Sequence, residues 1–136
     1  GTFAEYVSAK ESHISLKPES LTFAEAASLP LVSLTCIQAM RKGGITEEHR
    51  DSNKGKRILI HAGSGGVGSA AIQIAKYFKL FVITTCSKKN HDYVKSLGAD
   101  ICIDYKTQRF EEELKDDPVD FVFDVMGADL RGKFMC

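Results

Sequence analysis

The sequence predicts an α/β protein with a doubly wound parallel sheet, in which helices cover both faces. The first observation is an apolar strand pattern at 57–62 that leads into a helical pattern at 66–78 through a loop with four glycines. The second is the alternation of strand and helix patterns from residue 57 onward, which is typical of βαβ units. The third is the uninterrupted apolar centre of 119–125, as expected of a strand covered on both faces.

Different patterns precede residue 57. Residues 2–9 mix aromatic and β-branched side chains with polar ones, which predicts a strand. The stretch Thr22-Phe23-Ala24-Glu25 is a capping box that opens a short helix ending at Pro30, and 31–40 continues as a second apolar helix. Residues 41–56 are charged and lack apolar periodicity, so we expect a surface connection there.

The remaining patterns predict the sheet and its helices. The expected strands are 57–62, 80–85, 101–103 and 119–125, and the expected helices are 66–78, 88–97 and 107–115, with Gly98 as a C-cap. In a doubly wound sheet the first and fourth strands are neighbours, and ligands bind where the chain direction reverses between them. We therefore expect the loops at Gly63 and at Val125-Met126-Gly127 to converge on one ligand.

The glycine loop fits the spacing G-x-G-x-x-G with Gly63, Gly65 and Gly68. The first glycine allows a sharp turn, the second lets the backbone approach a pyrophosphate, and the third packs the helix against the strand. Backbone N–H groups and the positive end of the helix dipole make such a loop an anion site. The loop is predicted to hold a dinucleotide through Gly63, Ser64, Gly65, Gly66, Val67 and Gly68. A G-x-x-x-x-G-K phosphate loop is excluded, because the first lysine after the loop is Lys76.

The end of the second strand indicates which dinucleotide binds. Enzymes that use NAD usually place Asp or Glu about 20 residues after the loop, where it accepts hydrogen bonds from the ribose 2′-hydroxyl. No acidic residue occurs between Gly68 and Asp92, and the chain instead reads Ser87-Lys88-Lys89. Hydroxyl donors and two cations suit a 2′-phosphate, so the sequence favours NADPH over NADH. The alternative is a solvated basic turn.

Composition excludes several classes of partner. The chain has 136 residues, enough for about one domain, and its 43% hydrophobic content is sufficient for a core. Eighteen basic residues balance eighteen acidic ones, so we expect no binding to nucleic acid or to anionic membranes. The apolar stretches are of strand length, so no membrane span is expected. The cysteines show no C-x-x-C spacing and are interpreted as reduced intracellular thiols: Cys36, Cys86, Cys102 and Cys136.

Several stretches in one order carry a family resemblance. They are Gly1-Thr2-Phe3-Ala4-Glu5-Tyr6-Val7, Glu25-Ala26-Ala27-Ser28-Leu29-Pro30-Leu31, Leu34-Thr35, the loop from Ala62 to Gly68, Leu97-Gly98-Ala99-Asp100 and Ile103-Asp104-Tyr105. Together they resemble the medium-chain dehydrogenase/reductase superfamily and, within it, the zinc-free quinone oxidoreductase branch. The Gly43-Gly44 connection and Thr85-Cys86-Ser87 look most like organellar members, the reticulon-interacting oxidoreductases of mitochondria and the related proteins of plastid envelopes.

The resemblance implies a domain organisation. Residues 1–40 would be the end of a GroES-like substrate domain with linking helices, 41–56 a surface connection, and 57–136 part of a Rossmann-type dinucleotide-binding domain. Relative to the family, the chain begins late in the substrate domain and ends soon after the fourth strand. We therefore expect it to be part of a longer enzyme chain that forms a homodimer. We expect a cytoplasmic protein, with the mitochondrion or the plastid as the alternative.

The resemblance also implies roles for single residues around the cofactor. Gly65, Gly66 and Val67 would contact the pyrophosphate. Ser87, Tyr105 and one of the lysines Lys88 and Lys89 would surround the 2′-phosphate. The strand order, independently of the resemblance, predicts that Met126 and Gly127 border the nicotinamide half. Asn90 departs from the pattern, because related NADPH enzymes often have lysine there.

Two residues of the second predicted helix bear on catalysis. Thr35 matches a threonine near the nicotinamide and is the catalytic candidate, although a helix hydroxyl bonded back to a carbonyl is the alternative. Leu31 stands where zinc-dependent relatives have a cysteine ligand, and an aliphatic side chain cannot bind zinc, so no catalytic metal is expected. Elsewhere, His61 is expected to be a packed strand residue, with an acid or base as the alternative. Asp124 is expected to cap nearby N–H groups, and orientation of the loop at Gly127 is its alternative.

The expected function is hydride transfer from NADPH to a double bond conjugated to a carbonyl, in a quinone, an enone or an enoyl thioester. Such a small-molecule substrate needs no obvious acid–base pair, because the cofactor carries the chemistry. A non-catalytic module that binds NADPH and responds to redox state is the competing class. A zinc alcohol dehydrogenase is disfavoured by Leu31.

Overall fold

The computed structural model describes residues 2–127, and the chain divides into two compact units, residues 1–30 and 31–136. The first unit contains a 3-10 turn, η1 (Glu11–His13), and helix α1 (Phe23–Ala27). Thr22 caps α1 as predicted, since its Oγ1 accepts a hydrogen bond from Glu25 N at 3.2 Å and Glu25 Oε2 accepts one from Thr22 N at 2.8 Å. The capping box is confirmed.

The predicted strand at residues 2–9 is wrong. The segment bends at its start and forms no strand, and its side chains of Phe3 and Tyr6 are fully exposed. A strand needs a hydrogen-bonded neighbour, and the described residues before β1 offer none to this segment.

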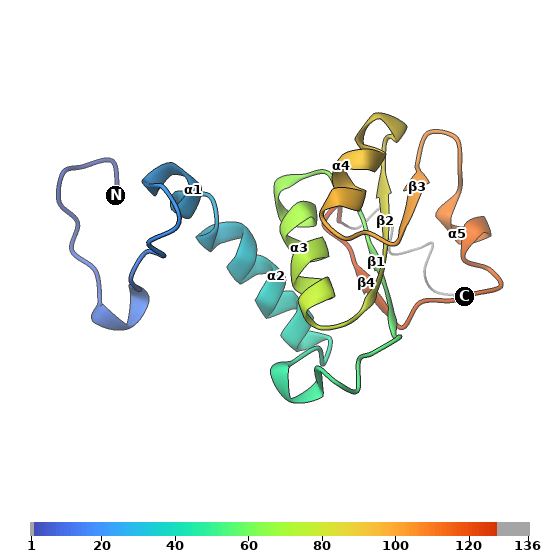
Figure 1. The fold of residues 1–136 in the computed structure, drawn as a ribbon, viewed down its shortest axis with the longest axis horizontal. Coiled ribbons are helices and arrows are strands. Elements are labelled where there is room, and N and C mark those ends of the chain that lie inside the picture. Colours follow the sequence, from blue (N-terminus) through green and yellow to red (C-terminus); the bar gives the residue numbers. More distant parts are fainter. Residues whose placement is uncertain (1, 128–136) are drawn as a thin grey trace. The chain divides into compact units, whose positions relative to one another are not determined.

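The second unit contains a parallel four-stranded sheet (Figure 1). Its strands are β1 (Arg57–Ile60), β2 (Phe81–Cys86), β3 (Ile101–Asp104) and β4 (Phe121–Phe123), in the order β3-β2-β1-β4. Its helical segments are α2 (Pro30–Lys42), η2 (Glu47–His49), α3 (Gly66–Tyr77), η3 (Lys88–Asn90), α4 (His91–Ser96) and α5 (Phe110–Glu113). The predicted topology, with β1 and β4 as neighbours, is confirmed, and Gly98 follows α4 with a φ of +108°.

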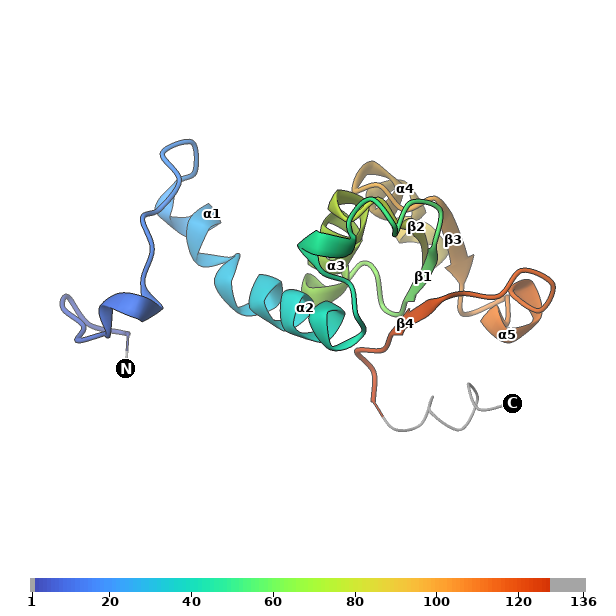
Figure 2. The same cartoon turned by 90° about the horizontal axis from the view of Figure 1, so that it is seen from below.

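Helices lie on both faces of this sheet, α3 and α4 on one side and α5 on the other (Figure 2). Alternate strand residues point to opposite faces. Ile58, Ile60 and Val82 pack in the core formed with α2, α3 and α4. Leu59, Ile83 and Ile103 pack against the segment around α5. The α/β class with a doubly wound sheet is therefore confirmed.

The strand at the sheet edge is less covered than predicted. Only Phe121–Phe123 of the expected 119–125 forms a strand, and Val122 at its centre is 42% exposed. Val122 pairs with Leu59, so its side chain lies on the same face of the sheet as α5. The residues around α5 pack on Leu59, Ile83 and Ile103 of the other three strands, and the cluster that they form does not include Val122. The expectation of a strand buried on both faces was wrong for this position.

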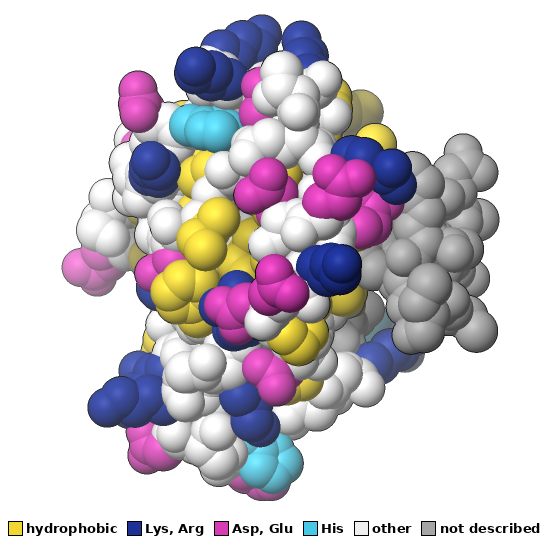
Figure 3. Space-filling view, turned by 90° about the vertical axis from the view of Figure 1, so that its right-hand side faces the viewer, with side chains coloured by type: hydrophobic (Ala, Val, Ile, Leu, Met, Phe, Trp, Pro, Cys, Tyr) yellow, Lys and Arg dark blue, Asp and Glu magenta, His cyan; other side chains and the backbone are white. Residues whose placement is uncertain are grey.

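The connection 41–56 is not wholly at the surface. Ile45 belongs to the main core, and the side chain of Asn53 is almost completely buried. On the protein's surface, basic and acidic side chains are interspersed over the face drawn in Figure 3, in keeping with the balanced net charge.

The run Phe23–Lys42, which takes in α1 and α2, has a mean hydropathy of 1.3 in its most apolar window. By length and composition alone it could cross a membrane. The helix is interrupted at Ser28 and Leu29, and Cys36 and Met40 in its second half are buried in the core. The absence of a membrane span stays a prediction.

The start of α3 packs against backbone. A Cβ at Gly68 would lie 2.2 Å from the carbonyl oxygen of Ala62 and 2.7 Å from Gly63 Cα. Neither atom is part of a flexible side chain, so the helix can approach the end of β1 only with glycine at this position. A Cβ at Gly66, two residues earlier, would meet only Val32 Cγ1 at 3.8 Å, an ordinary contact.

Gly68→Ala should therefore destabilise the protein by about 1–3 kcal/mol, because the added methyl group forces the helix away from the loop. The matched variant Gly66→Ala should be neutral or slightly stabilising. Urea unfolding followed by circular dichroism measures both. Equal stability of the two variants would show that the close approach is not required.

Candidate functional site

The carboxyl ends of all four strands lie on one edge of the sheet, because the strands are parallel. Each is followed by a segment predicted to bind the cofactor. These segments are the glycine loop after β1, Ser87 to Asn90 after β2, Tyr105 after β3, and Met126 with Gly127 after β4. The hydrogen bond from His61 N to Phe123 O, at 3.1 Å, joins the first and last of these loops at their bases.

The glycine loop turns at Ala62, which has a φ of +53°. Gly63, predicted to make the sharp turn, does not have a positive φ. A Cβ there would instead collide with Thr84 Oγ1 at 2.0 Å, so Gly63 is required by its closeness to β2. The role assigned to the first glycine is thus corrected, since it provides room rather than backbone freedom.

The loop leaves backbone donors at the start of α3. The first bond of the helix runs from Ser69 N to Gly65 O at 2.8 Å, so the N–H groups of Gly66, Val67 and Gly68 have no acceptor within the helix. Gly65 and Gly66 are exposed, and a Cβ at Gly65 would touch only Ala62 O at 3.3 Å. Backbone donors, the helix dipole and an open approach to the backbone fit an anion such as a pyrophosphate.

Helix α2 borders this loop. Cys36 Sγ donates to Val67 O at 3.3 Å, and burial raises the pKa of the Cys36 thiol to about 11, which keeps it protonated as a donor. Thr35 is exposed, and its Oγ1 donates to Leu31 O at 2.8 Å. This is the helix bond that was the alternative for Thr35, so its catalytic role stays a prediction.

The segment after β2 is held by its own polar contacts. Ser87 is 8% exposed, whereas Lys88 and Lys89 are exposed to solvent. Asn90 Nδ2 donates to Ser64 Oγ at 3.0 Å and to Ser87 Oγ at 3.4 Å. The amide thus connects the glycine loop to the segment predicted to bind the 2′-phosphate.

The segments after β3 and β4 are exposed at their tips. Tyr105 and Met126 are 62% and 67% exposed. Asp124 Oδ1 accepts hydrogen bonds from Met126 N at 2.8 Å and Gly127 N at 3.4 Å, so it caps this loop as predicted. The structure places Tyr105, Met126 and Gly127 at the edge where the other loops end, and their contacts with a cofactor stay predictions.

His61 and Thr85 lie next to Ala62, where the glycine loop begins. Thr85 Oγ1 accepts from Ala62 N at 3.3 Å and lies 3.0 Å from His61 Nδ1. The hydroxyl of Thr85 can donate to Nδ1 or accept from it, according to the tautomer of His61. The ring is 3% exposed and packs edge-on against Phe110, with centroids 4.8 Å apart. Burial lowers the pKa of His61, while Asp124 and Glu111 partly oppose this shift.

Thr85 and Asn90 were not predicted as parts of the site. The polar pair Thr84-Thr85 in an otherwise apolar strand was the available signal for Thr85, since a buried hydroxyl needs a partner. The contact of Asn90 with Ser64 joins residues 26 positions apart and has no local signature.

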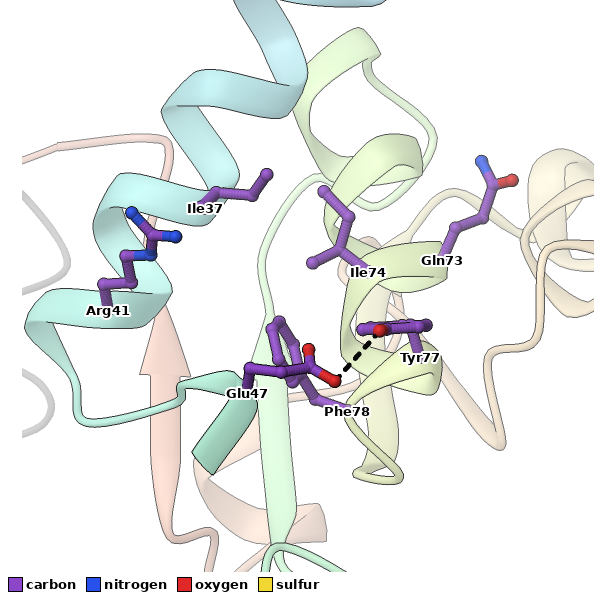
Figure 4. A pocket seen from close by; sticks show the side chains of 7 residues that line it. All are labelled: Ile37, Arg41, Glu47, Gln73, Ile74, Tyr77 and Phe78. Carbon is purple, nitrogen blue, oxygen red and sulfur yellow. Dashed lines mark hydrogen bonds between the residues drawn. The ribbon is translucent and has the colours of Figure 1, made fainter. Parts of the chain in front are cut away.

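Two pockets of the described residues lie away from the glycine loop. One of about 380 Å³ is formed by α2, η2 and α3 (Figure 4) and is lined by Ile37, Arg41, Glu47, Gln73, Ile74, Tyr77 and Phe78. Another, of about 220 Å³, lies beside β4. The loop itself exposes Gly65 and Gly66, which suits an extended ligand that binds through backbone groups.

The described residues contain no group of three or more His, Cys, Asp or Glu side chains that could hold a metal ion. Burial raises the pKa of the Cys86 thiol to about 11 and also raises that of Cys102, so both are thiols rather than thiolates at neutral pH. Cys136 lies outside the described residues.

A parallel sheet with a glycine loop and a helix start at its switch point defines a dinucleotide-binding type of α/β domain. The sequence profile of a family described as zinc-binding dehydrogenase matches residues 66–131. The chain is 44% identical over 130 residues to the human mitochondrial NAD(P)H oxidoreductase RTN4IP1, covering 94% of this chain and 32% of that protein. It is 40% identical over 129 residues to the Arabidopsis thaliana chloroplastic NADPH-dependent alkenal/one oxidoreductase, covering 93% and 31%.

Solved structures agree with this likeness. The quinone oxidoreductase from Coxiella burnetii superposes with a TM-score of 0.74 at 45% identity, covering 84% of this chain and 33% of that one. The chain belongs to the medium-chain dehydrogenase/reductase superfamily, in its quinone oxidoreductase-like branch. It spans about a third of the length of the relatives that it matches.

Protonation of His61 should destabilise the fold in acid. Since its pKa is lowered in the native state, the unfolded chain binds a proton near the ordinary value of 6.5 while the native ring stays neutral. Stability should thus fall as pH drops below about 6.5, by at most about 1.4 kcal/mol per pH unit.

Urea midpoints measured at several pH values between 7 and 5 test this expectation. His61→Gln should flatten the dependence, whereas His13→Gln, a change at an exposed histidine, should keep it. An unchanged slope in His61→Gln would contradict the assignment.

Proposed function

We propose that the protein of which this chain is part is an NADPH-dependent reductase. Its acceptor is a double bond conjugated to a carbonyl, in a quinone, an enone or an enoyl thioester. The observation that carries this proposal is the set of N–H groups of Gly66, Val67 and Gly68 at the switch point of the sheet, beside the exposed backbone of Gly65. The relatives named as NADPH-dependent, quinone and alkenal/one oxidoreductases support it.

The residues present fit the cofactor in two regions. The start of α3 would hold the pyrophosphate, and the segment after β2 would hold the 2′-phosphate through Ser87, Lys88 and Lys89. When bound, the reduced nicotinamide supplies the hydride. The loop with Met126 and Gly127 would border the nicotinamide, and Thr35 would lie near it on α2. The protein's part is to orient the ring and to exclude water.

The proposal extends to features of the whole protein. Residues 1–40 are the end of a substrate domain, 41–56 the connection and 57–136 part of the dinucleotide-binding domain. The reaction needs no zinc, which is supported by Leu31 at the ligand position of zinc-dependent relatives. We propose that the protein forms a homodimer. We also place it in an organelle, because the named relatives are mitochondrial or chloroplastic, and these names do not support the expected cytoplasmic location.

Hydride transfer from NADPH to a panel of quinones, enones and simple ketones tests the function on the whole protein. We expect reduction of the conjugated acceptors at a rate that chelator treatment leaves unchanged. Gly65→Val should abolish turnover, because its side chain would fill the approach to the backbone, while Gly43→Ala, a change remote from the loop, should not.

Three outcomes would contradict parts of the proposal. Activity that disappears with chelation and returns with zinc would overturn the metal-free mechanism. Cofactor binding without turnover of any acceptor would favour a non-catalytic binding module. Full activity of folded Gly65→Val would remove the glycine loop from the site.

Cofactor preference should follow the lysines after β2. Replacing both Lys88 and Lys89 with alanine should weaken NADPH binding by about tenfold or more, since two exposed cations beside a 2′-phosphate are lost. Binding of NADH should change little. Calorimetry on the double variant measures the affinities for both cofactors. A second double variant, Lys54→Ala with Lys115→Ala, removes the same charge from exposed positions outside the site and is the control. Equal losses for the two cofactors would contradict the phosphate assignment.

A further inference from the structure

The side chain of Asn90 joins two loops of the site. Its amide nitrogen donates to Ser64 Oγ in the glycine loop, at 3.0 Å, and to Ser87 Oγ at the end of β2, at 3.4 Å. Ser87 is buried, and Ser64 and Asn90 are half-buried. These contacts are therefore partly withdrawn from water.

The position of Asn90 makes this arrangement informative. Asn90 is the last residue of η3 and directly precedes α4, so the chain is already helical where asparagine would otherwise cap the helix with its side-chain oxygen. Asn90 makes no side-chain cap hydrogen bond. The ordinary reason for asparagine at a helix start is thus absent, and the side chain is used for the two serines instead.

The direction of these hydrogen bonds fixes what the serines can do. The amide nitrogen of asparagine only donates, so both serine oxygens accept. Each hydroxyl proton is then left for another acceptor, and neither hydroxyl donates to a protein atom among residues 2–127. Two O–H donors thus remain, and one of them belongs to the residue directly before Lys88 and Lys89. An acceptor-rich anion such as a phosphate matches this set.

We propose that Asn90 is a positioning residue that selects the 2′-phosphate of the cofactor by keeping Ser64 and Ser87 as donors. The inference rests on the proposed function and refines it. An aspartate at this position would accept from both hydroxyls and add a negative charge, so it would reverse the preference. A lysine would keep the donors, because its ammonium group also only donates. Asparagine achieves the selection without charge.

The test compares binding of adenosine 2′,5′-bisphosphate and of 5′-AMP to the whole protein by calorimetry. These probes differ only in the 2′-phosphate and need no turnover. In Asn90→Ala, binding of the bisphosphate should weaken about tenfold, and binding of 5′-AMP should stay unchanged. Asn90→Asp should weaken the bisphosphate further, and Asn90→Lys should retain it. Gln73→Glu, the same amide-to-carboxylate change on the exposed side of α3, should leave both affinities unaltered.

The ratio of the affinities for the bisphosphate and for 5′-AMP shows whether Asn90 positions the serines or only supports the fold. Equal weakening of both probes in Asn90→Ala, or no change in either, would overturn the role of Asn90 while leaving the proposed function intact. Failure of the unmodified protein to bind either probe would overturn both. The nearly isosteric Asn90→Asp variant decides the matter if Asn90→Ala unfolds, because its ratio must shift toward 5′-AMP.

Discussion

The site depends on the close approach of α3 to the end of β1. A Cβ at Gly68 would come within 2.2 Å of Ala62 O, so the helix start can lie over the strand end only without a side chain there. This contact aims the unbonded N–H groups of α3 at the loop edge. It also brings Val67 O within reach of the Cys36 thiol, which fixes α2 beside the loop. One backbone contact thus sets both the anion donors and the helix that flanks them.

The second strand supports the same loop through two hydroxyls. Thr84 Oγ1 donates to Ile60 O at 2.7 Å, and its closeness leaves no room for a side chain at Gly63. Thr85 Oγ1 accepts from Ala62 N, which helps to hold the left-handed turn of Ala62. Buried hydroxyls are stabilising only when they are bonded, and here both are bonded to β1 or to the loop that follows it. The strand therefore shapes the loop as well as the core.

Local patterns predicted most of the fold, because their causes lie within a few residues. The capping box at Thr22, the glycine after α4 and the strand order around the glycine loop all follow from sequence. The errors concern partners that are distant along the chain. A strand at 2–9 needed a neighbour, and the burial of Ile45 depends on a core assembled from helices and strands. The sequence predicted which residues border the cofactor, whereas the hydrogen bonds that join these residues, such as those of Asn90, were found only in the structure.

Asn90 and the lysine pair illustrate two physically different ways to recognise a phosphate. Exposed Lys88 and Lys89 attract it through charge, which dissolved salt screens over about 10 Å. Oriented hydroxyls act only at hydrogen-bond distance and depend on geometry rather than on ionic strength. The lysines would thus draw the anion toward the strand edge, and the serines would discriminate once it arrives. The same amide contacts Ser64 in the glycine loop and Ser87 at the end of β2, so the two hydroxyls that would discriminate the 2′-phosphate come from two different loops of the site.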